Sequence, residues 1–246
     1  MAEGELQGKT ALVTGGGRRI GREIALSLAA AGADVAITYL RSRREAAQTA
    51  GEICRNGVRA LALACDVRQE KSVREAVKRV THEFGGLDLL VNNAAIYETL
   101  EFEKITARQW DEMFATNVRG PFLVSQAALK TLRQRRGRII HLGSLGGLRP
   151  WATHAHYCAS KAALIMLTQV MAKALAPEIA VNCVAPGMID LGEGRDSALL
   201  RKVAAKTPMK RNGSSEEVVR AVRFFASAPQ FITGQVLAVD GGLGLE

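Results

Sequence analysis

The sequence predicts an α/β protein built on a single doubly wound parallel sheet of about seven strands, with helices on both faces. Short apolar runs alternate with amphipathic helical stretches from one end of the chain to the other. No proline- or serine-rich linker, internal repeat or low-complexity tract interrupts this alternation. Apolar runs joined by helices are typical of parallel strands that are buried on both faces and linked by right-handed crossovers. We therefore expect residues 1–246 to form one domain.

The predicted strands are short apolar segments that end at turns or at the start of helices. In chain order they span Lys9–Thr14, Asp34–Tyr39, Val58–Ala64, Leu87–Val91, Arg138–Leu142, Ala180–Val184 and Gln235–Val239. The predicted helices carry apolar residues three and four positions apart, so that one face of each can be buried. They span Ile20–Ala31, Arg43–Asn56, Gln69–Phe84, Ala107–Leu132 and His156–Leu175, with a mixed helical stretch over Asp196–Ala226.

Composition narrows the classes of function. The Met1–Lys9 segment is polar and acidic without an apolar core, so we expect no secretory signal. No apolar run approaches the roughly 18 residues of a membrane span, and we expect no membrane association. The scattered cysteines form no CxxC pair, which favours reduced packing residues in a cytoplasmic protein. They are Cys54, Cys65, Cys158 and Cys183.

The net charge of +9 is compatible with an acidic substrate, an acidic carrier protein or nucleic acid. Arginine clusters occur at Arg18-Arg19, Arg41–Arg44 and Arg133–Arg138. These clusters are dispersed and are not interleaved with aromatic residues, which make up only 5% of the chain. We therefore favour an acidic substrate or carrier and expect no nucleic-acid partner, which would show itself by salt-sensitive retention on DNA.

Tyr157 and Lys161 stand four positions apart in a predicted helix, so both side chains lie on the same face. A phenol has an ordinary pKa near ~10, and an ammonium group beside it favours the ionised form. The pair could therefore exchange a proton with a reacting oxygen. The same spacing also arises from an aromatic residue beside a solvated lysine, so the rest of the chain must decide between the two interpretations.

A glycine-rich turn, Thr14–Gly21, directly follows the first predicted strand and opens the first helix. Glycines in this setting let backbone N–H groups approach a pyrophosphate, which indicates a dinucleotide site. The second strand ends in Thr38–Ser42, without the carboxylate that would bind the ribose hydroxyls of NAD. Arg41 and Ser42 can instead bind a 2′-phosphate, helped by an arginine of the first turn. We therefore predict NADP(H).

These motifs have the order and spacing of the classical short-chain dehydrogenase/reductases, a family with a Rossmann-type fold that the chain resembles over essentially its whole length. Ser144 precedes Tyr157 by thirteen positions, as the family requires. The matching segments are Thr14–Gly21, Asp66-Val67, Asn92–Ala95, Asn117, Ser144, Tyr157, Lys161, Pro186-Gly187, Ile232–Gln235 and Asp240–Gly242.

The resemblance implies a catalytic role for four residues. Tyr157 would protonate the substrate oxygen during reduction, and Lys161 would lower the tyrosine pKa and bind the nicotinamide ribose. Ser144 would donate a hydrogen bond to the carbonyl oxygen, where negative charge develops as hydride arrives. Asn117 would hold a water that links Lys161 to solvent.

The resemblance also implies the cofactor contacts and a homotetramer. Asp66 and Val67 would contact the adenine, and Ile189 would lie beside the nicotinamide. No metal is expected, because His154 and His156 have no cysteine or carboxylate cluster nearby in the sequence. The expected cofactor-binding residues are Gly15, Gly17, Arg18, Arg19, Ile20, Gly21, Arg41, Ser42, Asp66, Val67, Asn93, Ala94, Ala95, Tyr157, Lys161, Pro186, Gly187 and Ile189.

Two positions depart from the family pattern. Arg19 stands where the turn usually has a glycine, which makes the turn similar to that of pteridine and dihydromonapterin reductases. Those enzymes typically have an aspartate where this chain has Ser144, and a serine favours ordinary carbonyl reduction. Asp190 replaces the threonine or serine that commonly meets the cofactor carboxamide.

The preferred function is that of an NADPH-dependent, 3-oxoacyl-[acyl-carrier-protein] reductase-like enzyme. Arg135 matches a carrier-contact position of that group, while Pro177-Glu178 stands where a second arginine is found. The segment 188–208 is expected to form a substrate lid, since it contains Gly192 and Gly194. The alternatives are a pteridine reductase-like enzyme and a non-catalytic protein that senses NADP.

Overall fold

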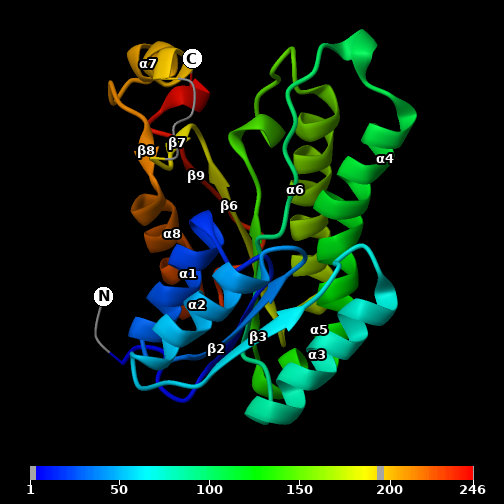
Figure 1. Ribbon diagram of the computed structural model, residues 1–246, viewed down its shortest axis with the longest axis vertical. Helices are drawn as coiled ribbons and strands as arrows, with labels where there is room; N and C mark the ends of the chain where they lie inside the picture. Colours follow the sequence, from blue (N-terminus) through cyan, green and yellow to red (C-terminus); the bar gives the residue numbers. More distant parts are fainter. Residues whose placement is uncertain (1–3, 193–196, 246) are drawn as a thin grey trace.

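The computed structural model describes residues 4–192 and 197–245. Within these ranges, seven parallel strands form one sheet in the order β3-β2-β1-β4-β5-β6-β9 (Figure 1). The strands are β1 Thr10–Val13, β2 Asp34–Tyr39, β3 Ala60–Ala64, β4 Leu89–Asn92, β5 Arg138–Leu142, β6 Ala180–Pro186 and β9 Val236–Val239. The order reverses between β1 and β4, and the carboxyl ends of strands at such a switch point form a natural ligand-binding crevice.

Helices cover both faces of the sheet, which confirms the predicted fold class. On one face lie α1 (Arg19–Ala30), α2 (Arg43–Cys54) and α8 (Ser215–Ser227), and on the other lie α3 (Glu70–Phe84), α5 (Gly120–Arg135) and α6 (Ala155–Leu175) (Figure 1). Side chains alternate across the strands, so that Val13 packs with the first set of helices and Leu12 with the second. The two resulting apolar cores hold the strand ends in fixed positions.

Most predicted elements agree with the observed ones to within two residues at each end. The predicted long helix near Ala107–Leu132 is helical throughout, but a π-helical turn over Ala115–Arg119 divides it into α4 (Ala107–Phe114) and α5. Pro121 stands in the first turn of α5, where a missing N–H costs little. A π-helical turn moves one residue out of the regular register, and such turns are frequent at functional sites.

The C-terminal part is more regular than the predicted mixed stretch. It contains α7 (Ser197–Lys206), and the short strand β7 (Ile189–Asp190) pairs with β8 (Gly213–Ser214) just before α8. Three short 3-10 helices complete the described elements, at Phe102–Lys104, Leu145–Gly147 and Leu243–Leu245. The predicted lid therefore includes a strand and a helix. Gly194 and Asp196 lie outside the described residues, and lid movement stays a prediction.

Among the described helices, α6 is long and apolar enough to cross a membrane by length and composition alone. A core helix of a globular protein passes the same test, and α6 buries Leu164, Ile165 and Leu175 within this fold.

Candidate active site

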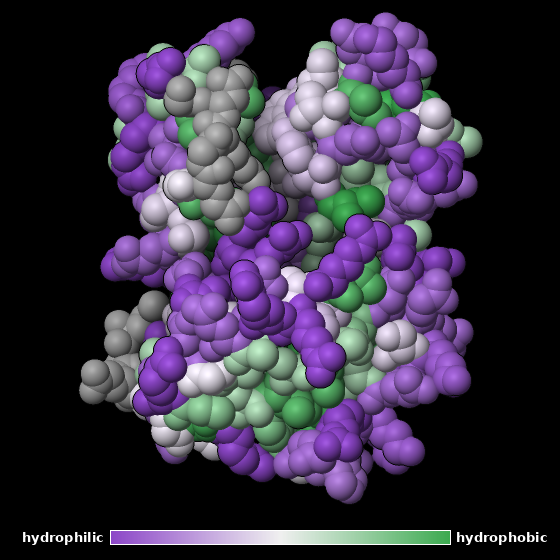
Figure 2. Space-filling model, in the orientation of Figure 1, coloured by the Kyte–Doolittle hydropathy of each residue, from purple (hydrophilic) through white to green (hydrophobic). Residues whose placement is uncertain are grey.

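A cleft of about 860 Å³ lies along the carboxyl ends of the central strands. Figure 2 shows this face of the molecule hollowed between the part around α7 and the part around α4. Residues of the glycine turn and the end of β2 line one part of the cleft, and Ser144, Tyr157 and Lys161 line another. The cleft thus combines the predicted dinucleotide site with the predicted proton-transfer groups.

The glycine turn is fixed to the loop after β4. Thr14 Oγ1 accepts hydrogen bonds from the backbone N–H groups of Asn93 and Ala94, both at 3.0 Å. Asn93 Nδ2 in return donates to the carbonyl oxygen of Thr14 at 2.9 Å. A Cβ atom at Gly21 would lie 2.4 Å from the Gly15 carbonyl oxygen, so this position requires glycine. The turn is therefore held in one shape by its neighbours.

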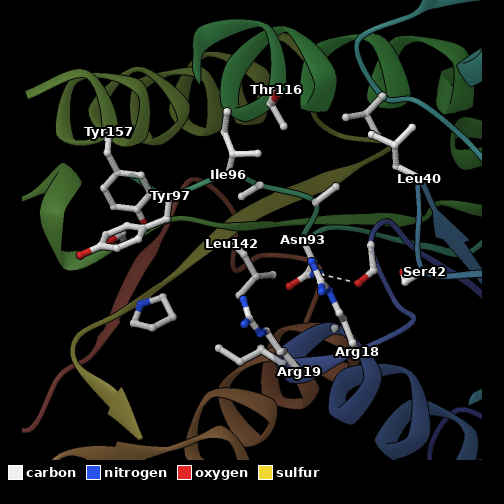
Figure 3. A pocket seen from close by; sticks show the side chains of 18 of the residues that line it. Arg18, Arg19, Leu40, Ser42, Asn93, Ile96, Tyr97, Thr116, Leu142 and Tyr157 are labelled. Atoms are coloured by element: carbon white, nitrogen blue, oxygen red, sulfur yellow. Dashed lines mark hydrogen bonds between the residues drawn. The ribbon is translucent and has the colours of Figure 1, made fainter. Parts of the chain in front are cut away.

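Two arginines of this turn point into the cleft, as Figure 3 shows for Arg18 and Arg19. Arg19 has a φ angle of 53°, in the left-handed region. This backbone conformation costs a non-glycine residue roughly 1–2 kcal/mol, which explains why glycine is usual at the position. In return for this cost, the turn carries the Arg19 guanidinium beside that of Arg18.

The end of β2 presents Arg41 and Ser42 to the cleft, as predicted. Glu45, in the first turn of α2, lines the cleft as well and was not foreseen. Asp66 also lines the cleft, but the guanidinium of Arg68 binds its carboxylate at 2.8 Å and holds the pKa of Asp66 below its usual value. This part of the cleft therefore contains an ion pair rather than an isolated carboxylate.

Tyr157 and Ser144 meet at the other end of the cleft. Burial raises the pKa of Tyr157 to about 12, and a hydrogen bond with Ser144 acts in the opposite direction. Lys161 is only 3% exposed, and its Nζ donates to the Leu142 carbonyl oxygen at 2.7 Å. Burial lowers the pKa of Lys161 to about 8.

The expectation that Lys161 lowers the tyrosine pKa is therefore not met. The ammonium points to Leu142 and lies 5.9 Å from the centre of the Tyr157 ring, so burial determines the direction of the shift. At neutral pH the phenol keeps its proton.

Asn117 lies in the π-helical turn and is fully buried. Its Oδ1 accepts from the Ile96 N–H at 2.9 Å, and its Nδ2 donates to the Ile96 carbonyl oxygen at 3.0 Å and to Ser160 Oγ at 3.1 Å. Asn117 does not line the cleft but holds the loop that does. The side-chain amide is thus occupied by contacts within the protein.

Nearly all the predicted site residues line the cleft; Gly17 and Asn117 do not. Gly17 lies against Ala46 of α2, where a Cβ atom would be only 3.2 Å from the Ala46 Cβ atom. Asp190 is absent from the lining, because its Oδ1 accepts from the Gly192 N–H at 2.9 Å. Sequence reasoning missed the lining residues Ile96, Tyr97, Arg68, Glu112 and Thr116. Ile96 and Tyr97 follow the β4 motif directly, so their position at a strand end was the available signal.

The fold and the cleft define a class, that of oxidoreductases with a dinucleotide cofactor. The glycine turn leaves space for a pyrophosphate, the arginines supply positive charge for an additional phosphate, and Tyr157 can give a proton to a reacting oxygen. The donor set thus fits a phosphorylated nicotinamide dinucleotide.

Comparison with known proteins identifies the family. A family model described as enoyl-(acyl carrier protein) reductase matches residues 16–244. The 3-oxoacyl-[acyl-carrier-protein] reductase FabG of Staphylococcus epidermidis is 38% identical over 240 residues, covering 96% of this chain and 98% of that protein. A short-chain dehydrogenase/reductase from Serratia marcescens has a TM-score of 0.92 at 36% identity, covering 98% of this chain and 99% of that one.

A gluconate 5-dehydrogenase from Burkholderia cenocepacia, solved in complex with NADP and tartrate, has a TM-score of 0.91 at 34% identity, with 98% and 97% of the two chains covered. The chain belongs to the short-chain dehydrogenase/reductase family. The family, fold class and enzyme class predicted from the sequence are thereby confirmed.

Proposed function

We propose that this oxidoreductase uses NADPH to reduce the 3-oxo group of an acyl thioester, as a 3-oxoacyl-carrier-protein reductase-like enzyme. The observation that carries the proposal is that Ser144 and Tyr157 interact in the same cleft as the arginine-rich glycine turn. When bound, the cofactor would supply a hydride for the carbonyl carbon. A serine hydroxyl and a tyrosine hydroxyl together can then stabilise and protonate the carbonyl oxygen.

The proton step suits the reductive direction. Because burial raises the pKa of Tyr157 to about 12, the phenol is protonated at neutral pH and can act as the acid. Ser144 donates to the same oxygen while negative charge develops on it. Lys161 would restore the proton to Tyr157 through water, and its pKa of about 8 allows it to give up a proton near neutral pH.

Asn117 takes part in this relay through its place in the fold. Its side-chain amide already binds Ile96 and Ser160, so backbone groups of the π-helical turn would hold the relay water. The proposal thus retains all four predicted catalytic residues and changes the way in which Asn117 acts.

Arg41 is proposed to select NADPH over NADH by binding the 2′-phosphate. The Arg41→Ala substitution should lower kcat/KM for NADPH about 10- to 100-fold, since it removes a charge-assisted hydrogen bond, and should leave the value for NADH within about twofold. Steady-state kinetics with both cofactors test this. Arg55→Ala is the matched control, because Arg55 is an exposed arginine at the end of α2 outside the cleft. Equal losses with both cofactors would contradict the assignment.

An acyl carrier protein is the proposed source of the substrate, in a cytoplasmic homotetramer. The net charge of +9 and the similarity to FabG support an acidic carrier as partner. Arg135 lies at the opposite end of β5 from the cleft, where its Nη2 donates to the Gly85 carbonyl oxygen at 2.7 Å. Within one chain, Arg135 therefore cannot contact a carrier docked over the cleft mouth.

The alternative of a pteridine reductase is supported by Arg19 and opposed by Ser144. We expect NADPH oxidation with an acetoacetyl thioester and little or none with a dihydropterin, when both are assayed in parallel with small ketones. A higher kcat/KM for the dihydropterin would reverse the assignment. Cofactor binding with no turnover of any carbonyl compound would favour an NADP-sensing protein.

A further inference from the structure

Tyr97 lies in the loop after β4 and forms part of the wall of the cleft next to Tyr157. The two rings meet edge to face, with centroids 4.9 Å apart and planes at 84° (Figure 3). This is one of the preferred geometries of an aromatic pair. Tyr97 is nevertheless 52% exposed, so about half of its surface is free to contact a ligand in the cleft.

The Tyr97 hydroxyl is bound to a histidine. Its oxygen lies 2.6 Å from His154 Nε2, and Thr99 Oγ1 lies 2.9 Å from the same nitrogen and 3.4 Å from the Tyr97 oxygen. With Nε2 unprotonated, the Tyr97 and Thr99 hydroxyls can both donate to it. His154 Nδ1 then carries the ring proton and donates to Thr153 Oγ1 at 3.0 Å. The Tyr97 hydroxyl is thus tied through the His154 ring to Thr153, in the segment just before α6.

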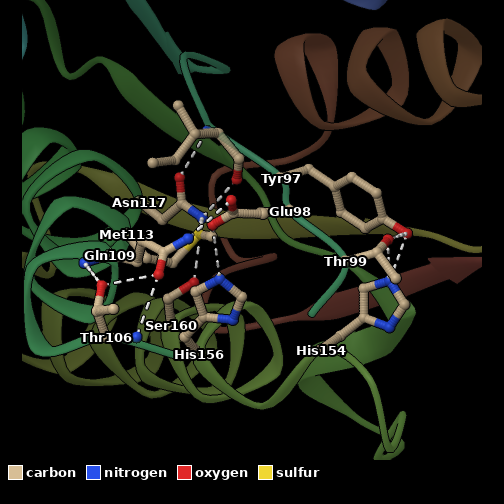
Figure 4. A network of polar contacts seen from close by, with 11 residues as sticks. Tyr97, Glu98, Thr99, Thr106, Gln109, Met113, Asn117, His154, His156 and Ser160 are labelled. Atoms are coloured by element: carbon tan, nitrogen blue, oxygen red, sulfur yellow. Dashed lines mark hydrogen bonds and ion pairs between the residues drawn. The ribbon is translucent and has the colours of Figure 1, made fainter. Parts of the chain in front are cut away.

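Hydrogen bonds also hold the backbone on either side of Tyr97. Ile96 exchanges two hydrogen bonds with Asn117, and the Leu100 N–H donates to the Thr153 carbonyl oxygen at 2.9 Å. Glu98 lies between His156, at 3.3 Å, and Gln109, at 3.0 Å. Figure 4 shows the contacts of Asn117 and Glu98, which join the loop to the π-helical turn, to Gln109 of α4 and to His156 in the first turn of α6. The ring of Tyr97 is therefore fixed relative to Tyr157, which lies in the same helical turn as His156.

We propose that Tyr97, held by His154, is a positioning and specificity-determining residue for the carbonyl reduction. The proposal rests on the reductase function proposed above. Tyr97 supports the Tyr157 ring through the edge-to-face contact, so that the Tyr157 hydroxyl meets the substrate oxygen. The exposed half of Tyr97 forms one wall of the pocket for the group attached to the carbonyl carbon.

The Tyr97 wall of the pocket determines which substituents on the carbonyl carbon can be bound. Trp151, Met188 and Leu191 also line the cleft, and the Trp151 ring meets the His154 ring at 5.5 Å. A rigid aromatic wall with apolar neighbours favours an apolar substituent that lies flat or extended against it. A linear acyl chain or an aryl group satisfies this condition, whereas a tertiary alkyl group does not. The preferred substrate class is therefore an unbranched or flat apolar ketone.

The experiment compares kcat and KM with NADPH for three substrates: an acetoacetyl thioester, phenyl methyl ketone and tert-butyl methyl ketone. The variants are Tyr97→Phe, Tyr97→Ala, His154→Ala and the double variant Tyr97→Phe/His154→Ala. Phe102→Ala is the control, since Phe102 is a highly exposed aromatic residue outside the cleft lining. Melting temperatures identify any variant that loses stability.

We expect Tyr97→Ala to lower kcat for the thioester about tenfold, through loss of the aromatic contact. It should also reduce the preference for the phenyl ketone over the tert-butyl ketone. Tyr97→Phe keeps the ring but loses the hydrogen bond to His154, so it should keep the preference and lower kcat less than Tyr97→Ala does. His154 acts through the Tyr97 hydroxyl, so His154→Ala should have no further effect on kcat when residue 97 is phenylalanine.

An unchanged kcat and an unchanged substrate preference in Tyr97→Ala would overturn the proposal. Independent effects in the double variant would overturn the part assigned to His154. If His154→Ala fails to fold, the comparison of Tyr97→Phe with Tyr97→Ala still tests whether the Tyr97 ring determines kcat and the substrate preference. A wild-type protein inactive with every ketone would overturn the reductase function and this proposal together. An active wild type with unaffected Tyr97 variants would overturn this proposal alone.

Discussion

Replacing Tyr157 with phenylalanine is expected to lower kcat for carbonyl reduction by about 10²- to 10⁴-fold, the usual contribution of a positioned general acid. The substitution removes only the hydroxyl, so the ring still meets Tyr97 edge to face. NADPH affinity should stay within about threefold, because the arginine-rich turn and the end of β2 lie at the other part of the cleft. Single-turnover kinetics and NADPH titration measure the two effects separately.

The control for this experiment is Cys158→Ser, which changes the next residue of the same helix and leaves the phenol intact. Cys158 is partly exposed, and its thiol pKa is raised by burial, so the thiol is not ionised at neutral pH. The control should keep kcat within about twofold, since it removes no group that we place at the reacting oxygen. Full turnover by Tyr157→Phe would show that the proton comes from another group, and the mechanism proposed above would fail.

The fold and much of the cleft were predictable because they follow from local signals. A glycine turn between a strand and a helix has few structural solutions, and Gly21 shows why: a Cβ atom there would meet the backbone of Gly15. The location of Arg41 follows from the end of a strand that periodicity already identified. Strand ends at one edge of a parallel sheet converge whatever the intervening helices contain.

The missed features depend on contacts between distant segments. Nothing in the apolar pattern of residues 107–132 indicates that Asn117 will bond to Ile96 and shift the helix into a π turn. The direction of Lys161 is likewise not a property of helix spacing. The ammonium could have reached the Tyr157 phenol, but the carbonyl oxygen of Leu142 on the neighbouring strand accepts its hydrogen bond instead. The role of Tyr97 depends on His154, which is 57 positions away.

Lys161→Met is expected to stabilise the fold at neutral pH while it lowers kcat at least about 100-fold. Lys161 is buried, and burial lowers its pKa from 10.5 to about 8. Below pH 8 the folded protein therefore carries a poorly solvated charge, at a cost of roughly 3 kcal/mol. Methionine removes this cost. It also leaves the Leu142 carbonyl oxygen without a donor, and this loss reduces the gain in stability by about 1–2 kcal/mol. A net gain of about 1–2 kcal/mol remains at pH 7.

The stability difference between Lys161→Met and wild type should depend on pH. Between about pH 8 and pH 10.5 the unfolded chain binds a proton at Lys161 that the folded chain releases, so wild-type stability rises with pH through this window. Lys161→Met lacks that rise, and its advantage should shrink toward zero or reverse near pH 10.5. Urea denaturation of both proteins at pH 7 and at pH 10 measures the difference. A variant less stable than wild type at pH 7 would mean that the buried ammonium stabilises the fold. A difference independent of pH would mean that folding does not shift the pKa of Lys161. Either result would contradict the prediction.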